Sequence, residues 1–527
     1  MDALARRKQP VKVLLELRPA LDKHAGIPQQ TRLLFRGLSL LDGITVEGLI
    51  QSSTHALRKG LPVHGTWKQP LTKHRQIDRL SRVVIMLEER FLRSRIGFIL
   101  ALVRRLIGAS ENLSLFDPSH FQDFIWRRLF ARSLPPSDFN TVTAARFRVA
   151  ETPWSAMHIC GAITKFLGLA VFPRLDTREL SVMIAETPYP GTVSSGTQLV
   201  VRYHDAIPLL MPHTISERRN HQAFHYRALR QNVRSGAWFV CVSEATRKDL
   251  LSVFPEVKSR SLTIHNVASH DYFDEVSSPS RVGEIVSMRL NAKAYRPPSG
   301  SARSFVSAGA IPANPEYLLM VSTIEPRKNH LSLLAAWERL RSESPRLRLM
   351  LVGHLGWHHA GIIAKIRPWL ERGEAYCLAD VPSPELRLLY KHARATICPS
   401  FAEGFDLSGV EAMASGGAVV ASDLPVHREV FADAARYFNP YSVDEMVATI
   451  GAVINADGVS NRCQLVMRGA EVAQRYKCEI VLPKWERFLT SLVGSEARAR
   501  LDAPIMTDAD DGRERGSFEV DAGRSEV

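Results

Sequence analysis

The chain has 527 residues, of which 45% are hydrophobic and 23% are charged, and its formal net charge is +14. This composition excludes a collagen-like or wholly disordered protein, and the length predicts two or three domains rather than one core. The surplus of basic residues favours partners that carry negative charge: phosphates, nucleic acid or an anionic membrane face.

The cysteine pattern and the absence of long apolar runs indicate the cellular compartment in which the protein is expected. The six cysteines form no CxxC pair and no Cys/His cluster with metal-ligand spacing. Scattered single cysteines are typical of a reducing compartment. The first residues lack the apolar core of a signal peptide, and no apolar run approaches the roughly 18 residues of a membrane-spanning helix. We therefore expect a cytoplasmic protein.

The first half of the chain opens with a strand–helix–strand pattern. Val11–Leu17 is a short apolar run, a helix-like segment follows it, and Thr45–Ser53 is a second strand-like run. This order predicts a parallel α/β sheet. Strand-like runs return later at Leu180–Glu186, Thr197–Asp205, Ala237–Ser243 and Ser261–Asn266.

Residues 55–180 are less regular, and we interpret them as a mostly helical insertion. Within them, Phe91–Gly108 combines apolar residues with four arginines. One interpretation is a basic amphipathic helix that lies on an anionic membrane. The alternative is a core helix with basic ends, because helical apolar stripes usually face a core.

The second half of the chain repeats the alternation of strands and helices. Residues 274–315 are rich in Pro, Ser and Gly and predict an inter-domain connection. From Tyr317 onward, strand-like and helix-like segments alternate as in a doubly wound sheet. We therefore predict an N-terminal domain over residues 1–273, a C-terminal domain over 316–494, and a disordered acidic tail over 495–527.

One stretch, "PSFAEGFDLSGVEAMASGGAVVASDLP", places Glu403 and Glu411 around the expected start of a helix, with Ser408 as its N-cap. The loop follows a strand, where open α/β sheets bind ligands, and a helix N-terminus suits a phosphate. Glu411, expected in the first helical turn, would reach past the phosphate to a ribose diol, and Glu403 would meet a second polyhydroxylated group. Such a pair suits a nucleotide-sugar site. The alternative is that Glu411 only complements the helix dipole and Glu403 is solvated.

This stretch resembles the E-x7-E signature of the retaining glycosyltransferases of the family-4 type, the group 1 glycosyltransferases, which include bacterial mannosyltransferases. A second segment, "LLMVSTIEPRKNHLSLLAAW", is similar to the part of the family that carries a donor-binding Arg-Lys pair. Weaker similarities are "VVRYHDAIPLLMP" and a glycine loop at Gly26. The resemblance implies the GT-B fold, in which two Rossmann-like α/β domains face a central cleft. Asp406 and Ser408 stand where the family usually has glycine and proline.

The resemblance also implies roles for individual residues. Arg327 and Lys328 would stabilise the leaving diphosphate, Glu403 would hold hydroxyls of the donor sugar, and His204 would contact that sugar. The residues expected to bind the donor are Glu411, Gly404, Phe405, Leu407, Ser408 and Gly26.

The implied reaction transfers a hexose from a nucleotide sugar with retention at the anomeric carbon, without a cofactor or an essential metal. The segment "EPRKN" at Glu325–Asn329 resembles one that is frequent among bacterial mannosyltransferases of surface-polysaccharide pathways. The resemblance therefore makes GDP-mannose the first choice of donor. The expected acceptor is a lipid-linked or polysaccharide precursor at the inner membrane face, in cell-surface polysaccharide biosynthesis, with peripheral membrane contact. Alternatives are a GT-B enzyme with a soluble acceptor, a sugar-nucleotide epimerase and, remotely, a basic nucleic-acid-binding protein. The chain has no helix-turn-helix, zinc-finger or RNP motif that would favour the last of these.

Overall fold

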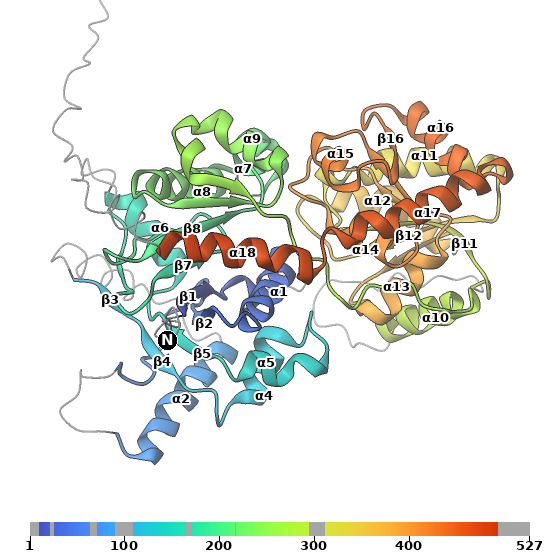
Figure 1. Ribbon diagram of the computed structural model, residues 1–527. Helices are drawn as coiled ribbons and strands as arrows, with labels where there is room; N and C mark the ends of the chain where they lie inside the picture. The colour runs from blue at the N-terminus through green and yellow to red at the C-terminus, as the bar shows by residue number, and fades with distance from the viewer. Residues whose placement is uncertain are drawn as a thin grey trace, which may run out of the picture.

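In the computed structural model, the chain folds into two α/β domains whose sheets lie side by side (Figure 1). The structure describes residues 10–21, 26–63, 71–89, 109–164, 171–216, 218–294 and 311–493. The tail over 495–527 and the segment Phe91–Gly108 lie outside the described residues.

The N-terminal domain is built on an eight-stranded sheet in the order β10-β9-β8-β7-β1-β2-β5-β4. Every neighbouring pair is parallel except β4 and β5. Apolar side chains are buried on both faces of this sheet, as expected for parallel strands covered by helices. The strands are β1 (Val11–Glu16), β2 (Ile44–Ile50), β4 (Ser114–Phe116), β5 (Arg146–Val149), β7 (Val182–Ala185), β8 (Gln198–Tyr203), β9 (Trp238–Cys241) and β10 (Ser261–Thr263).

Helices cover this sheet on both sides, and a separate two-stranded ladder joins β3 (Glu111–Asn112) to β6 (Leu175–Asp176). The α-helices are α1 (Ile27–Ser39), α2 (Lys73–Glu88), α4 (Gln122–Ile125), α5 (Phe139–Thr143), α6 (Trp154–Ile163), α7 (Ile207–Leu210), α8 (Arg218–Arg234) and α9 (Glu244–Val253).

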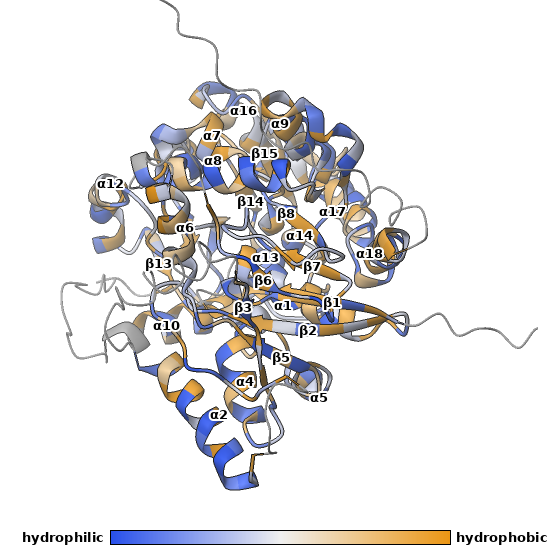
Figure 2. Ribbon diagram, turned by 90° about the vertical axis from the view of Figure 1, so that its left-hand side faces the viewer, coloured by the Kyte–Doolittle hydropathy of each residue, from blue (hydrophilic) through white to orange (hydrophobic). Residues whose placement is uncertain are grey.

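The insertion expected over residues 55–180 is only partly helical. Its strands β4 and β5 extend the main sheet beyond β2, and β5 pairs with β2 in parallel. These strands are short, three and four residues, and such short runs carry little periodic signal. The helix α2 extends away from the sheets, and Figure 2 shows hydrophilic colour along much of it.

The C-terminal domain has a six-stranded parallel sheet in the order β13-β12-β11-β14-β15-β16. Numbered from its first strand, this is the order 3-2-1-4-5-6 of a dinucleotide-binding fold, whose ligands bind where the strand order reverses. The strands are β11 (Glu316–Val321), β12 (Leu347–Val352), β13 (Ala375–Leu378), β14 (Ala395–Cys398), β15 (Val419–Ser422) and β16 (Ala435–Phe438).

Helices sandwich this sheet between two apolar cores. They are α10 (Ser280–Ala294), α11 (His330–Glu343), α12 (Ala360–Glu371), α13 (Ser383–His392), α14 (Leu407–Ala414), α15 (Pro425–Phe431), α16 (Val443–Ile454) and α17 (Val459–Gln474), and the chain continues into α18 (Cys478–Val493).

Two helices depart from the domain boundaries that the sequence predicts. The helix α10, within the expected connection over 274–315, packs against α13 and β13 and belongs to the C-terminal domain. The helix α18, expected in the C-terminal domain, lies across the N-terminal domain (Figure 1) and shares its core. An apolar helical stripe shows that a helix needs a partner and does not name the domain that supplies it.

The two domains touch through segments that follow β9 in one sheet and β14 in the other, and through α15. The hydroxyl of Ser243 donates to the carbonyl of Gly404 at 2.7 Å. Glu429 of α15 accepts hydrogen bonds from the backbone N–H groups of Glu244 and Ala245, at 2.7 and 2.9 Å, at the start of α9. These hydrogen bonds hold the N-terminal and C-terminal domains in contact.

No helix within the described ranges is long and apolar enough to cross a membrane.

Candidate functional site

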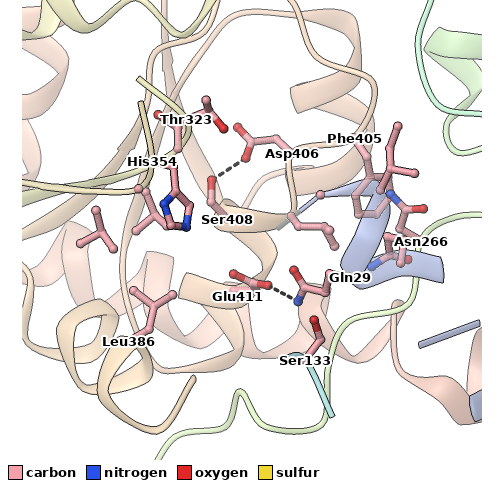
Figure 3. Close-up of a pocket in the computed structure, with 18 of the residues that line it drawn as sticks. Gln29, Ser133, Asn266, Thr323, His354, Leu386, Phe405, Asp406, Ser408 and Glu411 are labelled. Carbon is pink, nitrogen blue, oxygen red and sulfur yellow. Dashed lines mark hydrogen bonds between the residues drawn. The ribbon is translucent and has the colours of Figure 1, made fainter. Parts of the chain in front are cut away.

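A cavity of about 770 Å³ lies between the domains, a size typical of small-molecule sites. Its walls are loops at the carboxyl ends of strands from both sheets, where ligands bind in open α/β folds. Part of its lining is drawn in Figure 3. All ten residues that the sequence predicts for the site line this cavity: Gly26, His204, Arg327, Lys328, Glu403, Gly404, Phe405, Leu407, Ser408 and Glu411.

Glu403 is paired with both predicted cations. The Lys328 Nζ lies 2.5 Å from Glu403 Oε1, and the Arg327 Nη1 lies 3.0 Å from Glu403 Oε2. Burial alone would raise the pKa of Glu403, but Lys328 and Arg327 outweigh it and hold the pKa below its usual value. Glu403 is therefore an ionised carboxylate that is ion-paired with both Lys328 and Arg327, and it is not a solvated side chain.

Arg327 is held in place by a second set of partners. Its guanidinium donates to the carbonyl of Ala402 at 2.6 Å and to Glu325 at 2.8 Å. Burial would lower the pKa of Arg327, but Glu403 and Glu325 raise it above its usual value. A fixed, fully charged guanidinium next to a mobile ammonium is a suitable receptor for a diphosphate.

The helix α14 begins two residues earlier than the sequence predicts. Its N-cap is Asp406, in the left-handed region at φ 64°, and Ser408 is the second residue of the helix rather than the cap. The Ser408 hydroxyl donates to Asp406 Oδ1 at 2.5 Å (Figure 3). The Asp406 carboxylate therefore turns to a side-chain hydroxyl, and no side-chain cap covers the first N–H groups of α14.

Glu411 faces the N-terminal domain across the cavity. The Gln29 Nε2 donates to Glu411 Oε1 at 3.0 Å, and the Tyr390 hydroxyl donates to Glu411 Oε2 at 3.1 Å. Figure 3 shows Gln29 and Glu411 pointing toward one another. Burial raises the pKa of Glu411 to about 7, against the smaller opposing effect of these hydrogen bonds. Because α14 starts at Leu407, Glu411 lies beyond the first turn in which the sequence analysis placed it.

His204 follows directly after β8 and bonds to a carboxylate of its own domain. Its Nε2 lies 3.2 Å from Glu186 Oε2. Burial lowers the pKa of His204 and outweighs the opposing effect of Glu186, so the ring is neutral and its Nε2–H donates to the carboxylate. Arg202 lies two residues earlier on β8, is fully buried, and donates to Gln30 and Asn266 at 3.0 and 2.8 Å. This network fixes the N-terminal wall of the cavity.

Two of the predicted residues contribute backbone rather than side-chain chemistry. Gly26 is the N-cap of α1 at φ 71°, a conformation that glycine adopts without strain. The Phe405 ring is 4% exposed and packs on the Tyr476 ring in the C-terminal core. A Phe405 ring in that position stabilises the loop and leaves its backbone at the cavity.

Several residues of the site have no signal in the sequence motifs. Gln29 and Tyr390 bind Glu411, and His427 lies 3.2 Å from Asp406. Arg132 and Ser133 bring the insertion to the cavity wall. An arginine inside the apolar run "LVVRYHD" is the one sign that the sequence offered of the buried network under His204.

The described residues contain no group of three or more His, Cys, Asp or Glu side chains that could hold a metal ion.

Comparison with known proteins finds a family model that matches most of the C-terminal domain. Residues 303–466 match the model of the family "Glycosyl transferases group 1". This match covers the cavity walls that follow β11, β12, β13 and β14. It confirms the resemblance that the sequence analysis drew from the E-x7-E and Arg-Lys segments.

Several of the similar curated proteins are bacterial mannosyltransferases. The chain is 28% identical over 254 residues to the O-antigen chain mannosyltransferase B of Escherichia coli, covering 48% of this chain and 60% of that protein. It is 46% identical over 63 residues to the O-antigen chain mannosyltransferase RfbU of Salmonella typhimurium, 12% of this chain and 18% of that protein. It is 26% identical over 267 residues to a phosphatidyl-myo-inositol mannosyltransferase of Mycolicibacterium smegmatis, covering 48% and 67%. The first relative is thus matched over three fifths of its length.

Solved structures share the whole two-domain arrangement. Sucrose-phosphate synthase from Thermosynechococcus elongatus aligns with a TM-score of 0.54 at 14% identity, over 92% of this chain and 99% of that one. HepE of Anabaena, solved with UDP, aligns with a TM-score of 0.52 at 14% identity, over 92% and 100%. At this identity the likeness shows the fold alone, and the predicted GT-B fold is confirmed.

Proposed function

Because residues 303–466 match the model of the group 1 glycosyltransferases, we propose that this chain is a retaining hexosyltransferase. The proposed donor is a nucleotide sugar, with GDP-mannose as the first choice. The proposed acceptor is a lipid-linked or polysaccharide precursor of a cell-surface polysaccharide.

The observation that carries the proposal is the Arg327–Lys328–Glu403 cluster at the start of α14. Its distances are 2.5 to 3.0 Å, and it lies in a cavity of the right size between two Rossmann-like domains. A charged leaving diphosphate is stabilised by fixed donors that need no rearrangement during the reaction. The N–H groups at the start of α14 add donors of this kind.

Different residues are proposed to bind different parts of the donor: the diphosphate, the sugar and the ribose. Arg327 and Lys328 stabilise the charge that develops on the diphosphate as the glycosidic bond breaks. When Arg327 and Lys328 pair with the diphosphate instead of with Glu403, the Glu403 carboxylate becomes available to accept hydrogen bonds from sugar hydroxyls. Glu411 accepts from the ribose diol at the other end.

Two observations support the choice of sugar and acceptor. The three relatives described above are named as mannosyltransferases, two of them of O-antigen chains. The chain carries a net charge of +14, which suits an anionic membrane surface or a phosphate-linked acceptor.

The experiment measures nucleotide release from a panel of nucleotide sugars, with and without a membrane lipid extract. We expect release from one donor, dependent on the lipid fraction, and unchanged by a metal chelator. Glu403→Gln keeps the shape of the side chain and removes its charge, and we expect it to lower kcat by roughly 10²–10³-fold. The anomeric configuration of the product, read by NMR, tests retention.

The matched control is Glu371→Gln, an exposed glutamate at the end of α12 in the same domain, which we expect to behave as the wild type. Release that needs only a soluble sugar would replace the lipid acceptor in the proposal. No release from any donor, together with no binding of any nucleotide, would contradict the proposed function.

A further inference from the structure

We propose that His427 is a positioning residue of the diphosphate site, which neutralises Asp406 and so allows a carboxylate to stand at the start of α14. The inference rests on the proposed function, because it concerns the part of the site that would hold the donor diphosphate. His427 belongs to α15, which follows the next strand of the sheet, and its side chain is fully buried.

The hydrogen bonds of His427 fix a proton on its Nδ1. This nitrogen lies 2.8 Å from the carbonyl oxygen of Ser422 and 3.2 Å from the Ser422 hydroxyl. The Ser422 hydroxyl donates to the carbonyl of Ser400 at 2.6 Å, so only its lone pairs remain to face the ring. Both groups near Nδ1 are therefore acceptors, and Nδ1 must carry a hydrogen.

The other ring nitrogen faces an acceptor as well. The His427 Nε2 lies 3.2 Å from Asp406 Oδ2, and Asp406 Oδ1 accepts from Ser408. A neutral imidazole has one N–H, and this ring has acceptors at both nitrogens. A second proton must lie between His427 and Asp406, so the pair as a whole has no net charge.

Burial would raise the pKa of Asp406, but His427, Lys328 and Ser408 together outweigh it and hold the pKa well below its usual value.

The charge of the site depends on this pair. The ion-pair cluster contains the cations Arg327 and Lys328 and the carboxylates Glu325 and Glu403, and Lys328 is close enough to Asp406 to lower its pKa. Without the second proton of the His427–Asp406 pair, the carboxylates of this cluster outnumber its cations. The proton that the pair shares restores the balance. His427 lies behind Asp406, because its ring stacks on the Phe431 ring inside the domain.

The position of Asp406 explains why compensation is needed in this chain. Asp406 stands where the family usually has glycine, and its φ of 64° is the conformation that glycine favours. Glycine would need no counter-charge at this position. His427 and Asp406 therefore form a unit, and the effect of losing one depends on the presence of the other.

The test measures the dissociation constants of GDP and UDP, and of guanosine and uridine, by calorimetry. The wild type is measured first, and whichever of GDP and UDP it binds more tightly is then used, with its nucleoside, for every variant. The variants are His427→Gln, Asp406→Gly and the double variant. The control is His158→Gln, another buried histidine, which lies in α6 of the N-terminal domain. Melting temperatures report folding of each protein.

We expect His427→Gln to weaken diphosphate binding about tenfold or more, since an uncompensated carboxylate then faces the ligand. Binding of the nucleoside should change less than about threefold, because it lacks the phosphates. The double variant should recover diphosphate affinity to within about threefold of Asp406→Gly. The His158→Gln control should bind like the wild type.

Equal losses for nucleoside and diphosphate, or no recovery in the double variant, would show that His427 only supports the fold and would overturn the inference. If His427→Gln alone does not fold, the double variant decides, because the proposal requires that it folds and binds the diphosphate. A wild type that binds neither nucleotide overturns the proposed function itself, which separates the two failures.

Discussion

Glu411 is an acidic side chain that the structure holds among uncharged partners. Its pKa is raised from 4.5 to about 7 by burial, and Gln29 and Tyr390 supply its hydrogen bonds. Between these two pH values the folded protein keeps a proton that the unfolded chain has released. Protonation therefore stabilises the fold at low pH, and this contribution is lost as the pH rises through about 7.

The prediction concerns stability without ligand. Relative to Glu411→Gln, which stays neutral at every pH, the wild type should lose up to about 3 kcal/mol of unfolding free energy between pH 4.5 and 8. The melting temperatures of the two proteins, measured from pH 5 to pH 8, check this. A difference that stays constant with pH, or one that favours the wild type at pH 8, would contradict the assigned pKa.

At the scale of elements, the loop between β14 and α14 approaches the end of β8 at Gly404. A Cβ on Gly404 would lie 1.8 Å from the carbonyl oxygen of His204, which is backbone and has little room to move. Gly404→Ala should therefore keep the two domains apart by about an ångström or more. Misplacement of that size lowers turnover by as much as about 10²-fold, whereas nucleotide affinity should change little, because most of the phosphate site lies in the C-terminal domain.

Paired assays of turnover and nucleotide affinity check this prediction. The matched control is Gly361→Ala in α12, where an added Cβ meets nothing within 4 Å. Wild-type turnover in Gly404→Ala would show that the contact of Gly404 with His204 is not needed for activity.

The same elements show what the sequence could and could not predict. Most strands of the two main sheets were found from apolar runs because parallel strands are buried on both faces, whereas the short strands within residues 55–180 were missed. The loop after β14 was expected at a ligand site because it follows the carboxyl end of a strand. The start of α14 was misplaced because Ser408 is a favourable cap in isolation, whereas Asp406 adopts the left-handed conformation before it. The partner of Glu411 is Gln29, 382 residues away, and no local pattern joins two such positions.

At the scale of the whole molecule, α18 connects the last part of the chain to the first domain. Trp485 is fully buried in the N-terminal core, and Leu482 contacts α1 where an added Cβ on Gly37 would lie 2.5 Å from its side chain. The glycine thus allows the two helices to approach closely. Loss of α18 packing should therefore destabilise the domain formed by the start of the chain.

Trp485→Ala tests this dependence. Truncation of a fully buried tryptophan costs about 3–5 kcal/mol, and hydrogen exchange should show the loss of protection in β1 and α1 rather than in β11 to β16. The control is Ile480→Ala on the exposed side of the same helix, where the side chain is 50% exposed and the expected cost is below about 1 kcal/mol. If protection were lost first in the C-terminal sheet, α18 would belong to that domain, as the sequence predicts. A loss confined to the N-terminal sheet would mean that this domain is completed by the far end of the described chain, so that its sheet is not fully covered until α18 has been made.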